Sequence, residues 1–211
     1  ACADSFFDAD GREVTHLQIT ADFTTLRKQR DKSGSYPGLI TMDSLRLPVT
    51  ISVRGNNRLQ RKTCKYPPLR LAFDKGQRKD TVFASHKELK LVVMCRDARK
   101  YADFLRKEFL TYKAYSKLSS NSFQVHWLDV DYISDTAIGR DDHADTGTPA
   151  IVHSAPGFLI EQKKRMAKRT TLKQVPHPDV KAAQLDAYAA LIVDLFQYMI
   201  GNTDYSLVTS G

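Results

Sequence analysis

The chain lacks several features that would define its class at once. No apolar run approaches the roughly 18 residues that cross a bilayer as a helix. There is no internal repeat and no long low-complexity linker. The three cysteines, Cys2, Cys64 and Cys95, form no C-x-x-C pair, which argues against a zinc site. Cys64 and Cys95 fit either one disulfide in an oxidising compartment or two buried thiols, and their spacing does not decide between these.

An initiator methionine is also missing, because the chain begins with ACADS. We therefore expect a processed protein or a fragment. One alternative is a cleaved signal followed by a lipid-modified Cys2, although the hydrophobic segment that would establish it is not present. We expect the periplasm or cell envelope rather than the cytoplasm.

What the chain does have is a positive charge. It has 211 residues and a formal net charge of +8, with 42% apolar and 27% charged residues. This length can bury a sizeable core without disulfide or metal staples. The charge favours acidic partners such as nucleotides, nucleic acid or an anionic membrane surface, and it does not choose among them. The alternative is an ordinary solvated basic surface.

Alternating apolar residues predict an antiparallel sheet. Residues 45–54 (LRLPVTISVR) alternate strictly, which is typical of a half-buried strand. Further strands are predicted at 14–20, 69–73, 89–94, 123–133 and 157–161, and residues 23–38 are predicted as helix or loop. Helices are predicted at 98–118 and 180–200, the second with Asp179 as its N-cap. The order predicts an α+β fold in which the long helix packs on an antiparallel N-terminal sheet.

One carboxylate does not fit a simple core helix. Glu108 lies in the middle of an apolar stripe made by Tyr101, Phe104, Leu105, Tyr112 and Tyr115. A carboxylate in that position needs a basic partner, and Arg70 or Lys90 on the neighbouring strands could supply it. The pair is either purely structural or holds a cation over a phosphate, as kinases do between a strand Lys and a helix Glu.

Two other segments combine turn chemistry with polar side chains. In RGNNR, residues Arg54, Gly55 and Asn56 form a turn whose backbone and guanidinium suit a phosphate, although a plain hairpin turn has the same sequence pattern. In GNTD, residues Asn202 and Asp204 follow a helix end, where Asp204 could accept a hydroxyl proton while Asn202 orients it. Both are also common turn residues.

Five segments in order resemble one family. They are SVRGNNR…CKYPPLRLAF, HKELKLVVMCRD, EFLTYKAYSKLSSNSFQV, GFLIEQKKRMAKR and LFQYMIGNTDYS. Together they resemble a bacterial family of uncharacterised proteins that is similar to the spore-coat CotH kinases and, more distantly, to the HipA-type kinases. The resemblance covers roughly residues 15–206. It implies an atypical protein-kinase-like fold, with residues 1–160 as a sheet-plus-helix N-lobe and residues 161–211 as the start of a helical C-lobe.

The resemblance also implies an ATP- and Mg²⁺-dependent phosphotransferase. The residues that it assigns to the nucleotide are Arg54, Gly55, Asn56, Arg70 or Lys90 as the strand cation, Glu108 as its partner, and Glu161 where the strand meets the hinge. It makes Asp204 the catalytic aspartate, with Asn202 beside it, and leaves open whether the acceptor is a protein or a small molecule.

The family continues with a His-Asn pair and a Pro-Tyr-Asp-Phe-Asp segment that hold the metal ions, and this sequence has neither. We therefore expect no metal ligands and no phosphoryl transfer from this chain. The alternative is a non-catalytic binding or scaffold protein of the cell envelope.

Nucleic acid is the less favoured partner. The basic stretch 163–173 has no interleaved aromatic residues for base stacking, so a solvated helix face accounts for it. The segment GRDDHADTG has no fixed ligand scaffold, so we expect a solvated loop there rather than a metal site.

Overall fold

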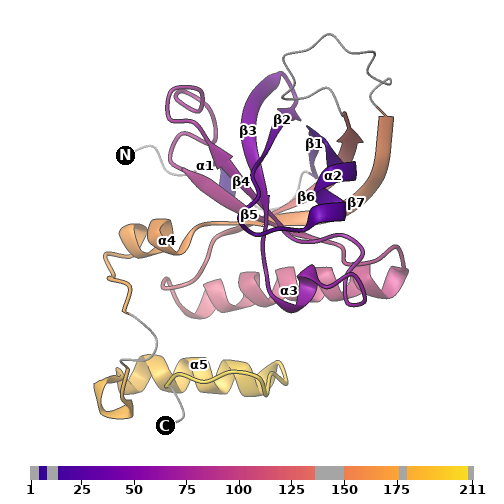
Figure 1. Ribbon diagram of the computed structural model, residues 1–211. Coiled ribbons are helices and arrows are strands. Elements are labelled where there is room, and N and C mark those ends of the chain that lie inside the picture. The colour runs from indigo at the N-terminus through magenta and orange to yellow at the C-terminus, as the bar shows by residue number, and fades with distance from the viewer. Residues whose placement is uncertain (1–4, 9–13, 136–149, 176–179, 209–211) are drawn as a thin grey trace.

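The computed structural model describes residues 5–8, 14–135, 150–175 and 180–208. Seven strands close into a barrel in the order β1-β2-β3-β4-β5-β7-β6 (Figure 1). The strands are β1 Thr15–Ala21, β2 Tyr36–Met42, β3 Leu45–Val53, β4 Leu69–Phe73, β5 Glu88–Val93, β6 Val125–Ser134 and β7 Ala150–Ile160. Neighbouring strands run antiparallel, except that β1 runs parallel to β6 and closes the barrel.

The kinase-like α+β fold expected from the sequence is therefore wrong. The expected sheet is antiparallel and N-terminal with a helical lobe after it, whereas the observed sheet is a closed, mixed barrel. Two features overturn the expectation. Residues 36–42 form β2, although the sequence favoured helix or loop up to residue 38. The closing pair between β1 and β6 joins Thr15 to Leu128, and no local pattern in the sequence indicates so distant a contact.

The local strand and helix predictions hold better than the topology. Residues 69–73 coincide with β4, and residues 45–54 contain β3. The inward residues of β3, Leu47, Val49, Ile51 and Val53, are all buried. The predicted helix 98–118 is α3, Arg99–Leu118.

The last helix starts later than predicted. It is α5, Ala187–Met199, and its N-cap is Asp186, whose carboxylate accepts a hydrogen bond from the Ala189 amide at 2.7 Å. The predicted cap Asp179 lies outside the described residues, as does the segment GRDDHADTG.

Two apolar clusters hold the fold together. The first fills the barrel with the inward side chains of the strands and is closed by α1 (Ser5–Asp8) and α2 (Phe23–Gln29). The second lies outside the barrel, where α3 packs across β6 and β7 (Figure 1). Its buried members are Val92, Leu105, Val125, Phe158 and Ile160. Leu105 is the buried anchor of the predicted stripe on α3, whereas Phe104 in the same stripe is 57% exposed.

The remaining helices are short, apart from α5. Helix α4 spans Lys163–Arg169, and two short 3₁₀ helices span Asn57–Leu59 and Ala182–Gln184. Helix α5 lies beyond α3 from the barrel (Figure 1), and the rings of Tyr115 and Phe196 join α3 to α5 at 5.0 Å. Within the described ranges, no helix combines the length and apolar character needed for a bilayer span.

The two cysteines whose state the sequence left open form a disulfide, Cys64–Cys95. It joins the segment before β4 to the segment after β5. The amides of Lys65 and Tyr66 also donate to the Cys95 carbonyl, at 2.8 and 3.3 Å. These bonds hold two loops together at one end of the barrel.

Candidate functional site

Two basic side chains lie side by side on the outside of the barrel. The register across β3, β4, β5 and β7 aligns Ser52 with Arg70, Arg70 with Lys90, and Lys90 with Ile160. The flanking leucines of β4 and β5 point into the barrel, so Arg70 and Lys90 point outward. Directly opposed like charges destabilise a sheet. An anion held between them would remove that cost.

Arg54 adds a third cation immediately after β3. Its Nε atom is buried and has no hydrogen-bond partner among the described residues. Burial lowers the pKa of the Arg54 guanidinium, and the nearby Arg58 and Arg70 act in the same direction, while Tyr112 and Glu108 oppose them. A buried guanidinium nitrogen with an unused hydrogen is unusual because buried polar atoms are normally hydrogen-bonded.

Lys90 stands in a positive field. Burial lowers the pKa of its ammonium group, and Arg54, Lys163 and Arg70 lower it further, against a smaller effect of Glu88. Glu88 is the ion-pair partner of Arg70, at 3.5 Å. We call Arg54, Arg70, Lys90 and Lys163 the cation cluster.

Glu108 pairs with a different base from either that the sequence suggested. Its Oε2 atom lies 3.1 Å from Nη2 of Arg58, the second arginine of the RGNNR turn. The Glu108 side chain is 34% exposed, so this ion pair sits at the edge of the second apolar cluster. Arg70 and Lys90 are left to the cation cluster.

An apolar pocket adjoins the cation cluster. It has a volume of about 350 Å³ and lies between α3, the segment before β6, α4 and α5. Its apolar wall consists of Tyr112, Tyr115, Phe123, Met166, Val193, Phe196 and Ile200, and its polar wall includes Glu108, Asn121 and Asn202. We call it the α3–α5 pocket. Phe123 connects it to the cluster, because Nζ of Lys90 lies 5.7 Å from the Phe123 ring centroid.

Asn202 and Asp204 take different places. Asn202 lines the α3–α5 pocket, but its side chain is already engaged: Nδ2 donates to Oε1 of Gln197 at 2.7 Å, and Oδ1 accepts from the Asp204 amide at 3.1 Å. These bonds shape the turn after Gly201, whose φ is 66°. Asp204 is exposed and does not line the pocket.

The turn that contains Arg54 is only partly directed at the cluster. Gly55 has a φ of 99°, which favours glycine at that position. Asn56 is exposed and accepts a hydrogen bond from Nζ of Lys32. The turn therefore directs Arg54 and Arg58 toward α3, while Asn56 contacts Lys32 in the segment before β2.

Glu161 has a structural environment. Its side chain is fully buried and accepts hydrogen bonds from the Gln124 amide at 2.8 Å and from Nη2 of Arg169 at 2.5 Å. The same Arg169 nitrogen donates to the Ser122 carbonyl at 2.6 Å. These contacts hold α4 against the segment just before β6. Within the described ranges, Glu161 makes no contact with the cation cluster.

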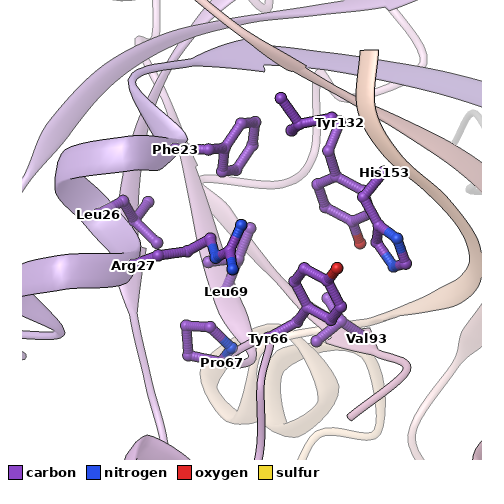
Figure 2. Close-up of a pocket in the computed structure, with 10 residues that line it drawn as sticks. Phe23, Leu26, Arg27, Tyr66, Pro67, Leu69, Val93, Tyr132 and His153 are labelled. Carbon is purple, nitrogen blue, oxygen red and sulfur yellow. The ribbon is translucent and has the colours of Figure 1, made fainter. Parts of the chain in front are cut away.

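A second polar site lies near the barrel wall beside α2 (Figure 2). Tyr66, His153 and Tyr132 stack in sequence, with ring centroids 4.0 and 5.5 Å apart, and Arg27 reaches toward Tyr66 from α2. Nδ1 of His153 lies 3.4 Å from Asp97, yet burial outweighs this carboxylate and lowers the pKa of His153. The enclosed volume is about 20 Å³, so the cavity holds no more than one water-sized molecule.

The sequence did not single out every residue that the structure brings to the site. Lys163 was part of a stretch expected to be a solvated helix face, and Arg58 belongs to the RGNNR segment but was given no role. A signal existed for Arg58, because it lies in the same short turn as Arg54. None existed for Phe123 or Phe196, whose role depends on the approach of α5 to α3.

No family model and no curated protein matches the chain. In the described ranges, no three His, Cys, Asp or Glu side chains come together in a way that could hold a metal ion.

Proposed function

We propose that the chain binds a nucleoside triphosphate such as ATP, with the phosphates on the cation cluster and the base in the α3–α5 pocket. The observation that carries this proposal is the register pairing of Arg70 with Lys90 beside the buried, unsatisfied Nε of Arg54. The fold keeps Arg54, Arg70 and Lys90 together at a cost that Glu88 offsets in part, and a multiply charged anion would offset the rest.

The shape and chemistry of the neighbouring pocket support a nucleotide over a free phosphate. A volume of about 350 Å³ falls within the range of small-molecule sites. Tyr112, Phe123 and Phe196 provide aromatic faces for stacking a base. The guanidinium groups of Arg54 and Arg70 can each donate two parallel hydrogen bonds to phosphate oxygens.

Phosphoryl transfer from ATP to a hydroxyl group of a protein or small molecule is the finer part of the proposal, and it requires metal-binding groups beyond those of the described residues. Asp204 would accept the proton of that hydroxyl group, since it lies two residues from Asn202 at the pocket wall. Mg²⁺ would arrive with the nucleotide phosphates and neutralise their charge. The described residues offer no cluster for it, so we derive no step through the metal.

A non-catalytic nucleotide-binding protein of the cell envelope is the second candidate. Two observations favour it. The Asn202 side chain is committed to its turn through Gln197 and the Asp204 amide, which limits its use in catalysis. The Cys64–Cys95 disulfide suits an oxidising compartment.

Calorimetric titration with ATP, with and without Mg²⁺, tests the binding proposal through the variant Lys90→Met. Charge-assisted hydrogen bonds contribute about 1.5–3 kcal/mol, so we expect the ATP affinity to fall by roughly 10- to 100-fold. The free protein should become more stable by about 0.2–1 kcal/mol, because one member of a like-charge pair is removed. Lys75→Met, on an exposed loop, is the matched control and should leave both quantities unchanged.

Two results would contradict the proposal. If Lys90→Met binds ATP with unchanged affinity, the cation cluster does not contact the phosphates. If the variant is less stable than the natural sequence, Lys90 stabilises the fold instead. Asp204→Ala separates the two candidates: it should keep ATP affinity, and it should abolish any phosphoryl transfer that the natural sequence performs.

A further inference from the structure

A second concentration of positive charge lies away from the α3–α5 pocket. A hollow of about 520 Å³ opens between α2, the segment before β4, and the segment after β5. Six basic side chains line it together with Thr24: Arg27, Lys28, Arg30, Arg61, Lys65 and Arg96. We call this the basic hollow.

Three of the arginines are held in place by backbone carbonyls. Arg30 donates from Nη1 to the carbonyls of Leu59 and Cys64, at 3.0 and 2.8 Å. Arg61 donates from Nη2 to the Lys28 carbonyl at 2.7 Å, and Arg96 donates from Nε to the Thr63 carbonyl at 3.3 Å. A carbonyl fixes a guanidinium without cancelling its charge. The hollow is therefore both ordered and strongly positive.

Carboxylates compensate little of this charge. Among the described residues, Lys65 is the one lining cation that forms an ion pair, with Asp97. Burial lowers the pKa of Arg30, and the charges of Arg61 and Arg27 lower it further. Collecting five uncompensated cations in one hollow opposes folding through their mutual repulsion.

The loops that carry these cations are tied together. The Cys64–Cys95 disulfide lies next to Lys65 and Arg96 in the chain, and the Lys65 amide donates to the Cys95 carbonyl at 2.8 Å. On the barrel side, the Arg27 guanidinium carbon lies 5.2 Å from the Tyr66 ring centroid (Figure 2). A site whose donors are fixed in advance loses less conformational entropy when it binds a ligand.

The helix dipole does not account for the hollow. The helix dipole stabilises basic side chains near the C-terminus of a helix, which accounts for Arg27 and Lys28 in the last turn of α2. It does not explain Arg61 and Arg96, which come from two other segments and converge on the same space.

We propose that the basic hollow binds a polyphosphoryl anion, a linear chain of at least three phosphates such as tripolyphosphate. Guanidinium groups on several sides suit successive phosphates, and the volume exceeds what one phosphate needs. None of the described residues that line the hollow is aromatic, so a nucleobase would find no ring there to stack on, which disfavours single-stranded nucleic acid. The hollow shares no lining residue with the cation cluster or with the α3–α5 pocket.

The test is a calorimetric titration of the whole chain with sodium tripolyphosphate, at roughly 100 mM salt to screen weak surface attraction. Lys28→Glu reverses one lining charge, and Lys28 makes no ion pair with any other described residue. We expect it to weaken the affinity by about tenfold or more. Lys75→Glu makes the same change in net charge on an exposed loop and should alter the affinity by less than about twofold.

Lys90→Met distinguishes the two sites. It should leave the tripolyphosphate affinity of the basic hollow, the component that Lys28→Glu weakens, unchanged even where it weakens ATP binding, so that either proposal can fail alone. The inference would be overturned by no saturable binding of tripolyphosphate, by equal losses in Lys28→Glu and Lys75→Glu, or by loss of binding in Lys90→Met. A single-stranded oligonucleotide that displaces tripolyphosphate and binds more tightly would also overturn it, by assigning the hollow to nucleic acid.

Discussion

The buried carboxylate of Glu161 should contribute far more to stability than any surface ion pair in the chain. Its side chain is 0% exposed, whereas that of its partner Arg169 is 25% exposed. Removing one member of a buried ion pair typically costs about 3–5 kcal/mol. Arg169 retains the Ser122 carbonyl as an acceptor, so we place Glu161→Gln near the lower limit, at about 3 kcal/mol. For a chain of this size, that corresponds to a fall in Tm of roughly 6–12 °C.

Urea unfolding followed by circular dichroism measures this free energy directly. Glu88→Gln is the matched control, because it removes the same charge from a partly exposed pair with Arg70 and should cost less than about 1 kcal/mol. At temperatures where both variants are folded, Glu161→Gln should bind ATP as the natural sequence does. If Glu161→Gln unfolds within about 0.5 kcal/mol of the natural sequence, or no more easily than Glu88→Gln, the structural role described for Glu161 is refuted.

Two further predictions concern the barrel. Burial lowers the pKa of His126 from its ordinary value of 6.5, so the unfolded chain takes up a proton first as the pH falls. Stability should therefore be lost as the pH falls through about 6.5 toward the lower folded-state pKa, and His126→Gln should reduce this loss in urea titrations; an unchanged pH dependence would contradict it. Gly38→Ala places a Cβ 2.6 Å from Cδ1 of Ile51 and should lower the free energy of unfolding by about 1–3 kcal/mol. The double variant Gly38→Ala/Ile51→Val should recover part of that stability. No recovery would show that the strain lies elsewhere.

The strands that the sequence predicted well are those whose side chains alternate. In β3, every second residue from Leu47 to Val53 is buried, so period and burial coincide. Strand β2 was not predicted because it contains Pro37 and Gly38, which are weak strand formers. Gly38 weakens the strand signal in the sequence, yet the strand needs a glycine at this position because a Cβ there would meet Ile51 and the Thr20 carbonyl.

The candidate site was less accessible to prediction than the strands. That Arg70 and Lys90 point away from the core follows from alternation alone, but their direct opposition depends on the register between β4 and β5. That register is set after a connection of residues 74–87, for which no pattern in the sequence fixes the alignment. The partner of Glu108 was missed for a related reason: Arg58 comes from a loop, and strand alternation says nothing about where a loop side chain ends.

The parallel pairing of β1 with β6 has a consequence for biosynthesis. Strand β1 pairs over its full length, from Thr15 opposite Leu128 to Ala21 opposite Ser134. At about 5–20 residues per second, the ribosome delivers that partner on the order of ten seconds after β1 itself. During this interval, one edge of the β1–β2 hairpin offers unpaired backbone groups to other nascent chains. The yield of folded protein should therefore depend on how crowded the polysome is and on chaperones that cover this edge until β6 arrives.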